Sequence, residues 1–411
     1  MSLRCGLLGQ KLGHSYSPFI HKSLGGSYSY ELFEVEPSGL ASFLEAGNFH
    51  GLNVTIPYKT AVMPFCGALS PTAAAIGSVN TVLRQKDGGL YGDNTDAAGF
   101  SAMIEGSGLF VKNKKVLVLG SGGSSLTVKY VLKNLGAGEI IVISRHGDET
   151  YENLVRHKDA AAIVNTTPVG MYPNTGAAPV NLDVFPRLEG VLDLIYNPAR
   201  TKLMMEAKRL NIPHIGGLTM LVSQAKHSAE LFIGGTVDPL KEAAVLTSVS
   251  HKMENIILIG MPGSGKTTIG RILAELTRRP FHDADAVIEA DSAMTIPEIF
   301  EKEGEAGFRT RETKVLEKLG KLSGTVIATG GGCVTKEENY AHLHQNGRIV
   351  FIRRPVALLA RKGRPLSQSG DLDNMYARRL PLYNSFADLA LDNDSKACAA
   401  ARNILKIISI Q

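Results

Sequence analysis

Two short apolar runs, each followed by a glycine-rich turn and a helical stretch, constrain the fold of this chain more than any other feature. The first run is Lys115–Gly120 (KVLVLG), which is followed by SGGSS and a helical pattern over Leu126–Leu135. The second is Asn255–Gly260 (NIILIG), which is followed by MPGSGKTT and a helical pattern over Ile269–Thr277. Short runs rich in Val, Ile and Leu are typical of buried parallel strands. The two units start about 140 residues apart, which predicts an α/β protein with two separate nucleotide domains.

Composition excludes several other classes of protein. The 411 residues are 44% hydrophobic and 20% charged, as in globular proteins of two or three domains. The net charge of +5 is too small to indicate binding of nucleic acid or a membrane surface. No apolar run approaches the roughly 18 residues of a membrane helix, and the N-terminus lacks the pattern of a signal peptide. The four cysteines are far apart and form no CxxC pair, which argues against a disulfide framework and favours the cytoplasm.

The second glycine turn matches the phosphate-binding pattern G-x-x-x-x-G-K-[ST] at Gly260–Thr267. Its glycines let backbone N–H groups point at phosphate oxygens, while Lys266 adds a positive charge and the Thr267 hydroxyl is suited to Mg²⁺. We therefore predict ATP contacts from the residues of this loop and the start of its helix, namely Gly263, Ser264, Gly265, Thr267 and Thr268.

Acidic and basic motifs follow in the same half of the chain. Asp283 and Asp285 stand at the end of a short strand pattern, PFHDAD, where two carboxylates suit Mg²⁺ and an acceptor hydroxyl. An acidic first turn of a helix with Asp283 as its N-cap explains the pattern equally well. The segments GEAGFRTRE, RPL and RLPLY carry arginines, which suit an anionic acceptor and the transferred phosphate, although each could also be a solvated surface residue.

Together these motifs resemble those of shikimate kinase over residues 253–411. The resemblance implies that Thr267 and Asp283 hold Mg²⁺ and that Asp285 binds the shikimate hydroxyls. It implies that Arg309 and Arg379 bind the shikimate carboxylate and that Gly331 approaches the ring. Arg364 would reach the transferred phosphate and Arg361 would stack on adenine, both from a polar segment, 361–370, expected to close over the nucleotide.

The first glycine turn, Gly120–Ser124 (GSGGS), follows a strand pattern and precedes a second one, Glu139–Ile143. A dinucleotide site that prefers NAD places an acidic residue about 20 residues beyond such a turn, where it binds the ribose hydroxyls. Ser144 and Arg145 stand there instead. Because a guanidinium attracts a 2′-phosphate and a carboxylate repels it, this position favours NADP.

Polar side chains ahead of this turn suit a polyol substrate. Lys59 ends the run NVTIPYK and Asp96 ends GDNTD; an amine and a carboxylate from separate strands could form a proton-transfer pair, or each could be a surface charge. Ser15, Ser17, Thr55 and Asn80 add hydroxyl and amide groups, for which turn and cap roles are the alternative.

Seven ordered motifs in residues 1–250 resemble those of shikimate 5-dehydrogenase: GHSYSP, GLNVTIPYK, IGSVNT, GDNTD, VNTTPVGM, DLIYNP and GLTMLVSQA. The resemblance implies that Lys59 and Asp96 are the catalytic pair. It implies substrate contacts from Ser15, Ser17, Thr55, Asn80, Tyr196 and Gln224. It also implies an NADP site formed by Gly120, Ser121, Gly122, Gly123, Ser124, Ser144, Arg145, Leu194 and Gly217.

The resulting interpretation is a fusion of two enzymes. Residues 1–250 would form a two-lobed dehydrogenase, with a substrate lobe at 1–100 and about 217–245 and a Rossmann-like NADP lobe at 101–216. Residues 253–411 would form a P-loop kinase domain with a parallel sheet. The stretch from Arg145 to AAIVNTT is only about 17 residues, too short for the extra strand and helix that the resemblance implies.

The predicted function is NADPH-dependent reduction of 3-dehydroshikimate to shikimate, followed by ATP- and Mg²⁺-dependent phosphorylation of shikimate to shikimate 3-phosphate. Two alternatives remain at this point. The dehydrogenase half could be a non-catalytic binding module for the kinase, or it could be an NAD-linked quinate/shikimate dehydrogenase. The expected partners are small molecules, and the sequence leaves the oligomeric state open.

Overall fold

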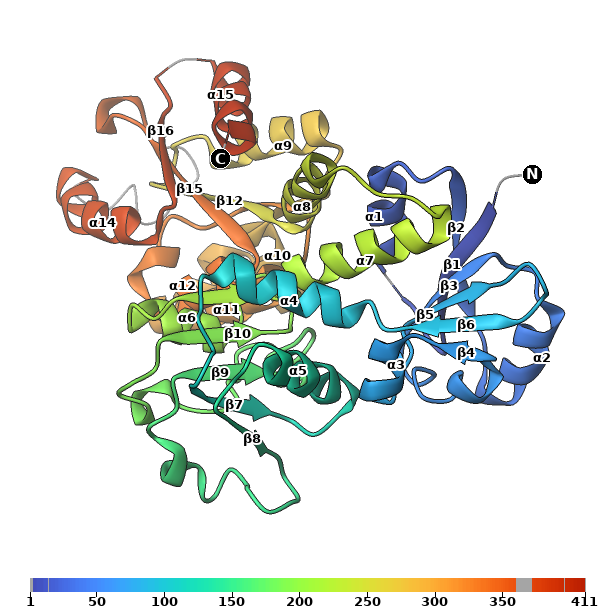
Figure 1. Ribbon diagram of the computed structural model, residues 1–411. Helices are drawn as coiled ribbons and strands as arrows, with labels where there is room; N and C mark the ends of the chain where they lie inside the picture. Colours follow the sequence, from blue (N-terminus) through green and yellow to red (C-terminus); the bar gives the residue numbers. More distant parts are fainter. Residues whose placement is uncertain (1–2, 14, 360–371, 395, 411) are drawn as a thin grey trace. The chain divides into compact units, whose positions relative to one another are not determined.

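The computed structural model (Figure 1) describes residues 3–13, 15–359, 372–394 and 396–410. It divides into two units. Unit 1 contains Met1–Met171, Ala177–Tyr196 and Leu203–Ser250, and unit 2 contains Tyr172–Gly176, Asn197–Lys202 and His251–Gln411. The chain passes from unit 1 to unit 2 within helix α8 (Pro239–Met253), so the region between the two expected domains is helical.

The first part of unit 1 is a mixed six-stranded sheet in the order β2-β1-β3-β5-β6-β4. Strand β1 runs parallel to β2 and β3, whereas β5 is antiparallel to β3 and β6. The strands are β1 (Leu3–Gly9), β2 (Tyr28–Glu34), β3 (Gly51–Val54), β4 (Ala68–Leu69), β5 (Thr81–Arg84) and β6 (Leu90–Asp93). The helices are α1 (Ser17–Leu24), α2 (Leu40–Ala46) and α3 (Pro71–Ile76), with 3₁₀ turns η1 (Pro37–Gly39) and η2 (Met63–Phe65).

The second part of unit 1 is a parallel five-stranded sheet in the order β11-β10-β9-β7-β8. Its strands are β7 (Lys115–Leu119), β8 (Glu139–Ile143), β9 (Ala162–Asn165), β10 (Gly190–Asp193) and β11 (His214–Gly216). Four helices accompany it: α4 (Asp96–Ser107), α5 (Gly123–Asn134), α6 (Lys202–Arg209) and α7 (Leu218–Ile233), with 3₁₀ turns η3 (Leu154–His157) and η4 (Leu182–Val184). Only η3 lies between β8 and β9, so the extra strand and helix are absent from this described segment, as the short spacing predicts.

Unit 2 is built on a parallel five-stranded sheet in the order β13-β14-β12-β15-β16. The strands are β12 (Asn255–Ile259), β13 (Phe281–Asp283), β14 (Val326–Ala328), β15 (Gly347–Arg353) and β16 (Leu389–Asp392). Its helices are α9 (Lys266–Thr277), α10 (Ala284–Ser292), α11 (Ile296–Gly320), α12 (Glu338–His344), α14 (Leu372–Phe386) and α15 (Ala397–Ile410), and its 3₁₀ turns are η5 (Cys333–Thr335) and η6 (Val356–Leu358).

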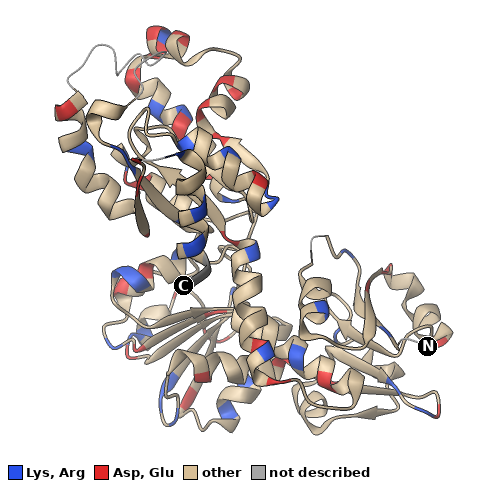
Figure 2. Cartoon of the chain, turned by 90° about the horizontal axis from the view of Figure 1, so that it is seen from above, with Lys and Arg blue, Asp and Glu red and all other residues tan. Residues whose placement is uncertain are grey.

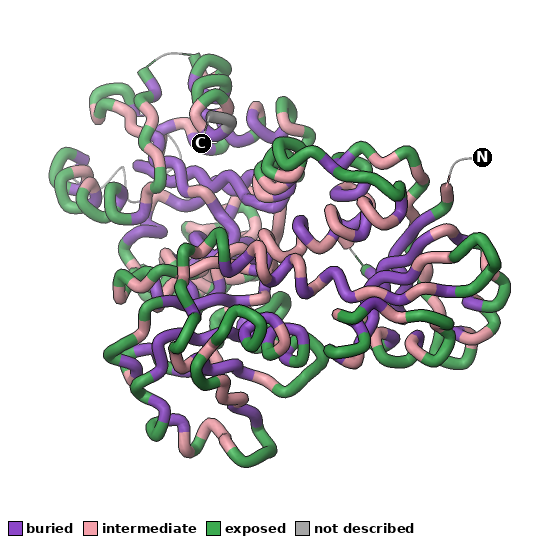
Figure 3. Tube along the Cα trace, viewed as in Figure 1, coloured by how far each residue is buried: buried purple, intermediate pink, exposed green. Residues whose placement is uncertain are grey.

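Both faces of the unit 2 sheet are covered, which explains why β12 is buried at all five positions. One core joins alternate residues of β12, Ile257 and Ile259, to helices α10, α11, α12 and α14. The other core joins Ile256 and Leu258 to helices α9 and α15. Figure 3 shows the same pattern, with buried strands at the centre and exposed loops around them. A parallel sheet buried on both faces requires continuous apolar strands such as NIILI.

The surface carries charges of both signs. Basic and acidic residues are interspersed along the helices of both units (Figure 2). Within the described residues, no helix is long and apolar enough to cross a membrane.

Candidate active sites

The loop between β12 and α9 has the geometry that a phosphate-binding loop needs. Gly260 and Gly265 have φ angles of 145° and 99°, in the region that favours glycine. A Cβ atom on Gly260 would lie 2.5 Å from the carbonyl oxygen of Ile352, so no other residue fits there without movement. Lys266 is the first residue of α9, and its buried Nζ donates to the carbonyl oxygens of Gly260 (2.9 Å) and Met261 (3.0 Å). The side chain of Lys266 therefore lies along the loop. The loop itself leads into the N-terminus of helix α9, a position at which free backbone N–H groups bind phosphate.

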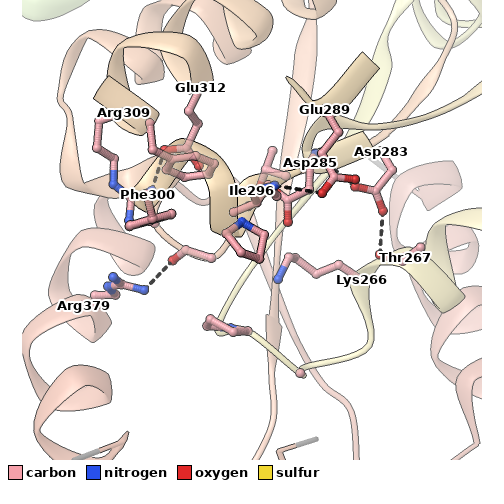
Figure 4. A pocket seen from close by; sticks show the side chains of 18 of the residues that line it. Lys266, Thr267, Asp283, Asp285, Glu289, Ile296, Phe300, Arg309, Glu312 and Arg379 are labelled. Atoms are coloured by element: carbon pink, nitrogen blue, oxygen red, sulfur yellow. Dashed lines mark hydrogen bonds and ion pairs between the residues drawn. The ribbon is translucent and has the colours of Figure 1, made fainter. Parts of the chain in front are cut away.

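This loop forms one wall of a cavity of about 260 Å³ in unit 2 (Figure 4). Ten of the residues predicted from the sequence line it: Gly263, Gly265, Lys266, Thr267, Thr268, Asp283, Asp285, Arg309, Gly331 and Arg379. Ser264 is fully buried and lies outside the lining. The predicted contacts Arg361 and Arg364, and the segment 361–370, lie outside the described residues.

Thr267 and Asp283 meet at one end of this cavity. The Thr267 hydroxyl donates to Oδ2 of Asp283 at 2.7 Å, and Oδ1 of Asp283 accepts from the backbone N–H of Asp285 at 3.1 Å. Asp283 thus caps helix α10, as one of the two sequence interpretations predicts, and its other carboxylate oxygen faces the hydroxyl of Thr267. A hydroxyl and one carboxylate beside a phosphate site are sufficient protein ligands for Mg²⁺, which keeps waters and takes phosphate oxygens as its other ligands. Among the described residues, no group of three His, Cys, Asp or Glu side chains could hold a metal by itself.

Asp285 lies deeper in the same cavity. Its Oδ1 is buried and has no hydrogen-bond partner within the described part of the chain. Burial raises the pKa of Asp285 to about 6, and the charges of Asp283 and Glu312 add to this effect, whereas Lys266 and Arg309 oppose it. A carboxyl group whose pKa lies near neutrality is suited to exchange a proton with an acceptor hydroxyl.

Arg309 and Arg379 form the opposite side of the cavity. Arg309 Nη1 donates to Oε2 of Glu312 at 2.6 Å, and Arg379 Nη1 donates to the carbonyl oxygen of Gly331 at 3.1 Å. The glycines of the turn after β14 make room for these groups: a Cβ atom on Gly332 would lie 2.1 Å from Nη2 of Arg309. Two buried guanidinium groups in a small cavity suit a carboxylate ligand.

Sequence reasoning missed Glu312. Its side chain is fully buried, and burial raises its pKa although Arg309 and Arg379 oppose the rise. Glu312 follows Arg309 by three residues on α11, a spacing that places the two on one helix face and could have indicated the pair. The apolar part of the lining, Ile296, Pro297, Phe300 and Phe308, was also not predicted.

We expect Asp285→Asn to stabilise unit 2 at pH 8. The raised pKa means that the folded state binds a proton more tightly than the unfolded state, so ionisation of Asp285 costs stability as pH rises from about 4 to about 6. At one pKa unit per 1.36 kcal/mol, the variant gains up to about 3 kcal/mol above pH 6, and the gain vanishes toward pH 4. Calorimetric unfolding of the full chain at several pH values measures this. Asp291→Asn, an exposed carboxylate on the same helix, is the control; a variant Asp285→Asn no more stable than the unmodified protein at pH 8 contradicts the expectation.

Unit 1 contains a second cavity, of about 370 Å³, lined by strands β1 and β3 of the first sheet and by residues that follow strands β10 and β11 of the second. Lys59 Nζ and Asp96 Oδ2 lie 2.6 Å apart at its wall. Neither residue is on a strand, contrary to the sequence interpretation: Lys59 lies in the turn after β3, and Asp96 is the first residue of α4. The two side chains are only 27% and 14% exposed, so the ion pair is shielded from bulk water while remaining open to a ligand.

The structure gathers the predicted substrate residues around this pair. Ser15, Ser17, Thr55, Asn80, Tyr196 and Gln224 all line the cavity, as do Ser124, Leu194 and Gly217. Asn80 is held in place because its Oδ1 accepts from the backbone N–H of Thr95 at 2.7 Å. Sequence reasoning missed Lys11 and Asn53, which also line the cavity; Lys11 lies close to the recognised GHSYSP motif.

A third cavity, of about 710 Å³, lies beside the glycine turn after β7. Gly120, Ser121, Gly122, Ser144 and Arg145 line it, together with Tyr151, Thr166 and Thr167, which were not predicted. Ser124, Leu194 and Gly217 line the substrate cavity instead, and Gly123, the first residue of α5, lines neither. Cβ atoms on Gly122 and Gly123 would meet nothing within 4 Å, so the backbone of the turn faces open space. An exposed helix N-terminus with Arg145 on the same cavity fits a phosphorylated dinucleotide.

Comparisons with known proteins agree with this geometry. Residues 7–82 match the family model "Shikimate dehydrogenase substrate binding domain", and residues 262–409 match "Shikimate kinase". The NADP(+) shikimate dehydrogenase of Clostridium perfringens (strain SM101 / Type A) is 36% identical over 257 residues, which cover 58% of this chain and 94% of that protein.

Solved structures give the same result. A chorismate mutase/shikimate 5-dehydrogenase fusion protein from Clostridium acetobutylicum has a TM-score of 0.59 at 35% identity, over 61% of this chain and 98% of the other. Shikimate 5-dehydrogenase from Thermus thermophilus, solved with NADP(H) and shikimate, has a TM-score of 0.55 at 33% identity, over 60% and 99%. Quinate dehydrogenase from Corynebacterium glutamicum, solved with NAD, has a TM-score of 0.55 at 27% identity, over 60% and 99%. The chain therefore belongs to the shikimate dehydrogenase family, and its C-terminal part carries a shikimate kinase domain.

Proposed function

We propose that this chain is a bifunctional shikimate-pathway enzyme that reduces 3-dehydroshikimate to shikimate with NADPH and phosphorylates shikimate with ATP. The observation that carries the proposal is that each unit gathers its own distinct set of candidate reactive groups around one cavity. Unit 1 holds the Lys59–Asp96 pair in a cavity lined by hydroxyls and amides. Unit 2 holds a phosphate-binding loop beside two carboxylates and two buried arginines.

In unit 1 the protein binds and orients the substrate and moves a proton. The hydroxyls of Ser15, Ser17 and Tyr196 and the amides of Asn80 and Gln224 are suited to the ring substituents and the carboxylate. When bound, NADPH supplies a hydride. The carbonyl oxygen of 3-dehydroshikimate then gains a proton from Lys59, and Asp96 holds the amine directed at that oxygen.

In unit 2 the protein neutralises charge and positions the acceptor. Arg309 and Arg379 bind the shikimate carboxylate, and Asp285 accepts a hydrogen bond from the 3-hydroxyl group and then its proton. Lys266 and the backbone of the loop hold the phosphates of ATP. Thr267 and Asp283 would hold Mg²⁺, which would supply positive charge beside the phosphates. Phosphoryl transfer depends mainly on such positioning and electrostatics.

One coupled assay tests the proposal. The full chain is supplied with 3-dehydroshikimate, NADPH and Mg-ATP, and we expect oxidation of NADPH and formation of shikimate 3-phosphate. Omitting ATP should stop the reaction at shikimate, and starting from shikimate with Mg-ATP alone should still give the phosphorylated product. Absence of NADPH oxidation would instead support a non-catalytic dehydrogenase half.

Arg145 is expected to select NADP. Its guanidinium lines the cavity beside the glycine turn, where it is available for a 2′-phosphate. Its charge also reaches Tyr151 on the same cavity: burial raises the pKa of Tyr151, and Arg145 partly opposes that rise. Arg145→Ala should raise KM for NADPH by about 10–100-fold, the equivalent of the 1.5–3 kcal/mol of a charged hydrogen bond, and leave KM for NADH nearly unchanged. Arg156→Ala, an exposed arginine on η3, is the matched control. Equal use of NADH and NADPH by the unmodified chain would favour the NAD-linked quinate/shikimate alternative.

We further propose that the enzyme works in the cytoplasm on small molecules alone. All four cysteines are free thiols, as is usual in a reducing compartment.

A further inference from the structure

Asn393 joins the end of strand β16 to the phosphate-binding loop. It follows Asp392, the last residue of β16, and is only 1% exposed. Its Nδ2 donates to the carbonyl oxygen of Ser264 at 2.7 Å. Its own backbone is fixed as well, because its N–H donates to the carbonyl oxygen of Arg353 at 2.7 Å, at the end of β15. The amide is therefore a rigid donor directed at one peptide group of the loop.

That peptide group is the one that joins Ser264 to Gly265. In a trans peptide the C=O and N–H bonds lie in one plane and point in opposite directions. A donor that holds the Ser264 carbonyl on one side therefore directs the Gly265 N–H to the other side. Gly265 and Lys266 line the cavity, whereas Ser264 and Asn393 do not. The hydrogen bond thus helps to keep a loop N–H available to the phosphates.

The geometry leaves little freedom at this point. A Cβ atom on Gly265 would lie 2.8 Å from Nδ2 of Asn393, so the loop and the amide are packed directly against each other. Lys266 holds two further carbonyls of the loop, those of Gly260 and Met261. Oδ1 of Asn393 has no partner among the described residues. A buried amide whose oxygen has no hydrogen-bond partner lowers the stability of the fold. A function of the Nδ2 group of Asn393 in the loop would explain why the protein keeps this residue.

We propose that Asn393 is a positioning residue for the nucleotide phosphates, acting through the Ser264–Gly265 peptide. The inference rests on the proposed kinase function of unit 2. It does not require Asn393 to touch the nucleotide: its side chain acts on the loop, and the loop binds the phosphates.

The experiment compares Asn393→Ala, which removes the donor, with Asn393→Asp, which keeps the shape but replaces the donor by an acceptor. Asp392→Asn is the matched control, since Asp392 is exposed at the end of the same strand and pairs with Arg353 on the surface. For each full-length variant we measure KM for ATP, KM for shikimate, and inhibition by ADP and by adenosine. Thermal unfolding and NADPH oxidation show whether the chain is folded.

Asn393→Ala should raise KM for ATP and the inhibition constant of ADP by about 3–10-fold, as for loss of one neutral hydrogen bond. Asn393→Asp should raise them by more, since a carboxylate repels both the Ser264 carbonyl and the phosphates. KM for shikimate and inhibition by adenosine should be unchanged in both variants, and Asp392→Asn should behave like the unmodified protein.

Three results would overturn the inference. Equal weakening of adenosine and ADP would mean that Asn393 contacts the base. A parallel rise in both KM values with lower thermal stability, in Asn393→Ala and in the near-isosteric Asn393→Asp, would mean a purely structural role. Unchanged ADP inhibition in a folded Asn393→Asp variant would mean no role. If the unmodified chain does not phosphorylate shikimate, ADP binding is measured directly by calorimetry. Binding that still depends on Asn393 would then remove the proposed kinase function and leave the role of Asn393 in phosphate binding intact.

Discussion

Replacing Lys59 by alanine is expected to lower the turnover of 3-dehydroshikimate by about 10²–10⁴-fold, the usual cost of losing a general acid or base. Lys59 and Asp96 form an ion pair of 2.6 Å at the wall of the substrate cavity. In the proposed mechanism Lys59 is the proton donor for the carbonyl oxygen, and the variant lacks it. Asp96→Asn should also slow the reaction, because the amine loses the charge that directs it.

The same Lys59→Ala variant should phosphorylate shikimate at the unmodified rate, since the reactive groups of the kinase all lie in unit 2. Spectrophotometric NADPH oxidation and a coupled ADP assay measure the two reactions on one preparation. Lys22→Ala, an exposed lysine on helix α1, is the matched control and should leave both rates unchanged. A folded Lys59→Ala variant that retains full dehydrogenase activity would exclude Lys59 as the proton donor.

Lys266→Ala is expected to show the opposite pattern, with a loss of kinase activity of about 10²–10³-fold, as for removal of one group that stabilises transition-state charge. Lys266 is buried at the start of α9 and is directed along the phosphate-binding loop. Alanine removes a positive charge that no neighbouring side chain of the loop replaces. NADPH-dependent reduction should continue at the unmodified rate.

Because Lys266 also bonds two loop carbonyls, the loop geometry needs a separate check. Lys266→Arg keeps the charge and should retain more activity than Lys266→Ala if charge is the main contribution. Lys314→Ala, an exposed lysine on α11, is the control. If folded Lys59→Ala or Lys266→Ala lost both activities, the two sites would be coupled, and the picture of two independent catalytic units would be wrong.

Features that depend on local sequence were predictable. The strands β7 and β12, their glycine turns and the helices that follow lie close to the expected ranges. The pattern of a β-rich run, a glycine turn and a helix is local, so each part specifies its own conformation. The missing strand and helix between Arg145 and β9 were also predictable, because chain length alone excludes them.

The local sequence pattern did not predict which charged side chains face the cavity. The segment GEAGFRTRE contains two arginines and two glutamates, and Glu312 is the second of these glutamates. In the structure Arg309 is 7% exposed and holds Glu312, whereas Arg311 points outward and pairs with Glu303. The resemblance to shikimate kinase selected Arg309, but Glu312 was missed because its burial comes from the packing of α11 against the sheet.

The sequence by itself determined the two glycine-turn units, the α/β class and the family resemblance, and it supplied the candidate reactive groups, because these depend on short motifs and their order. Only the tertiary structure decided which groups meet. Lys59 and Asp96 are 37 residues apart in sequence and 2.6 Å apart in space, and Asn393 reaches a loop 129 residues before it. Such pairs arise when strands from distant parts of the chain end at the same edge of a sheet. The order and alignment of those strands are set by burial of the faces of the sheet rather than by any local signal in the sequence.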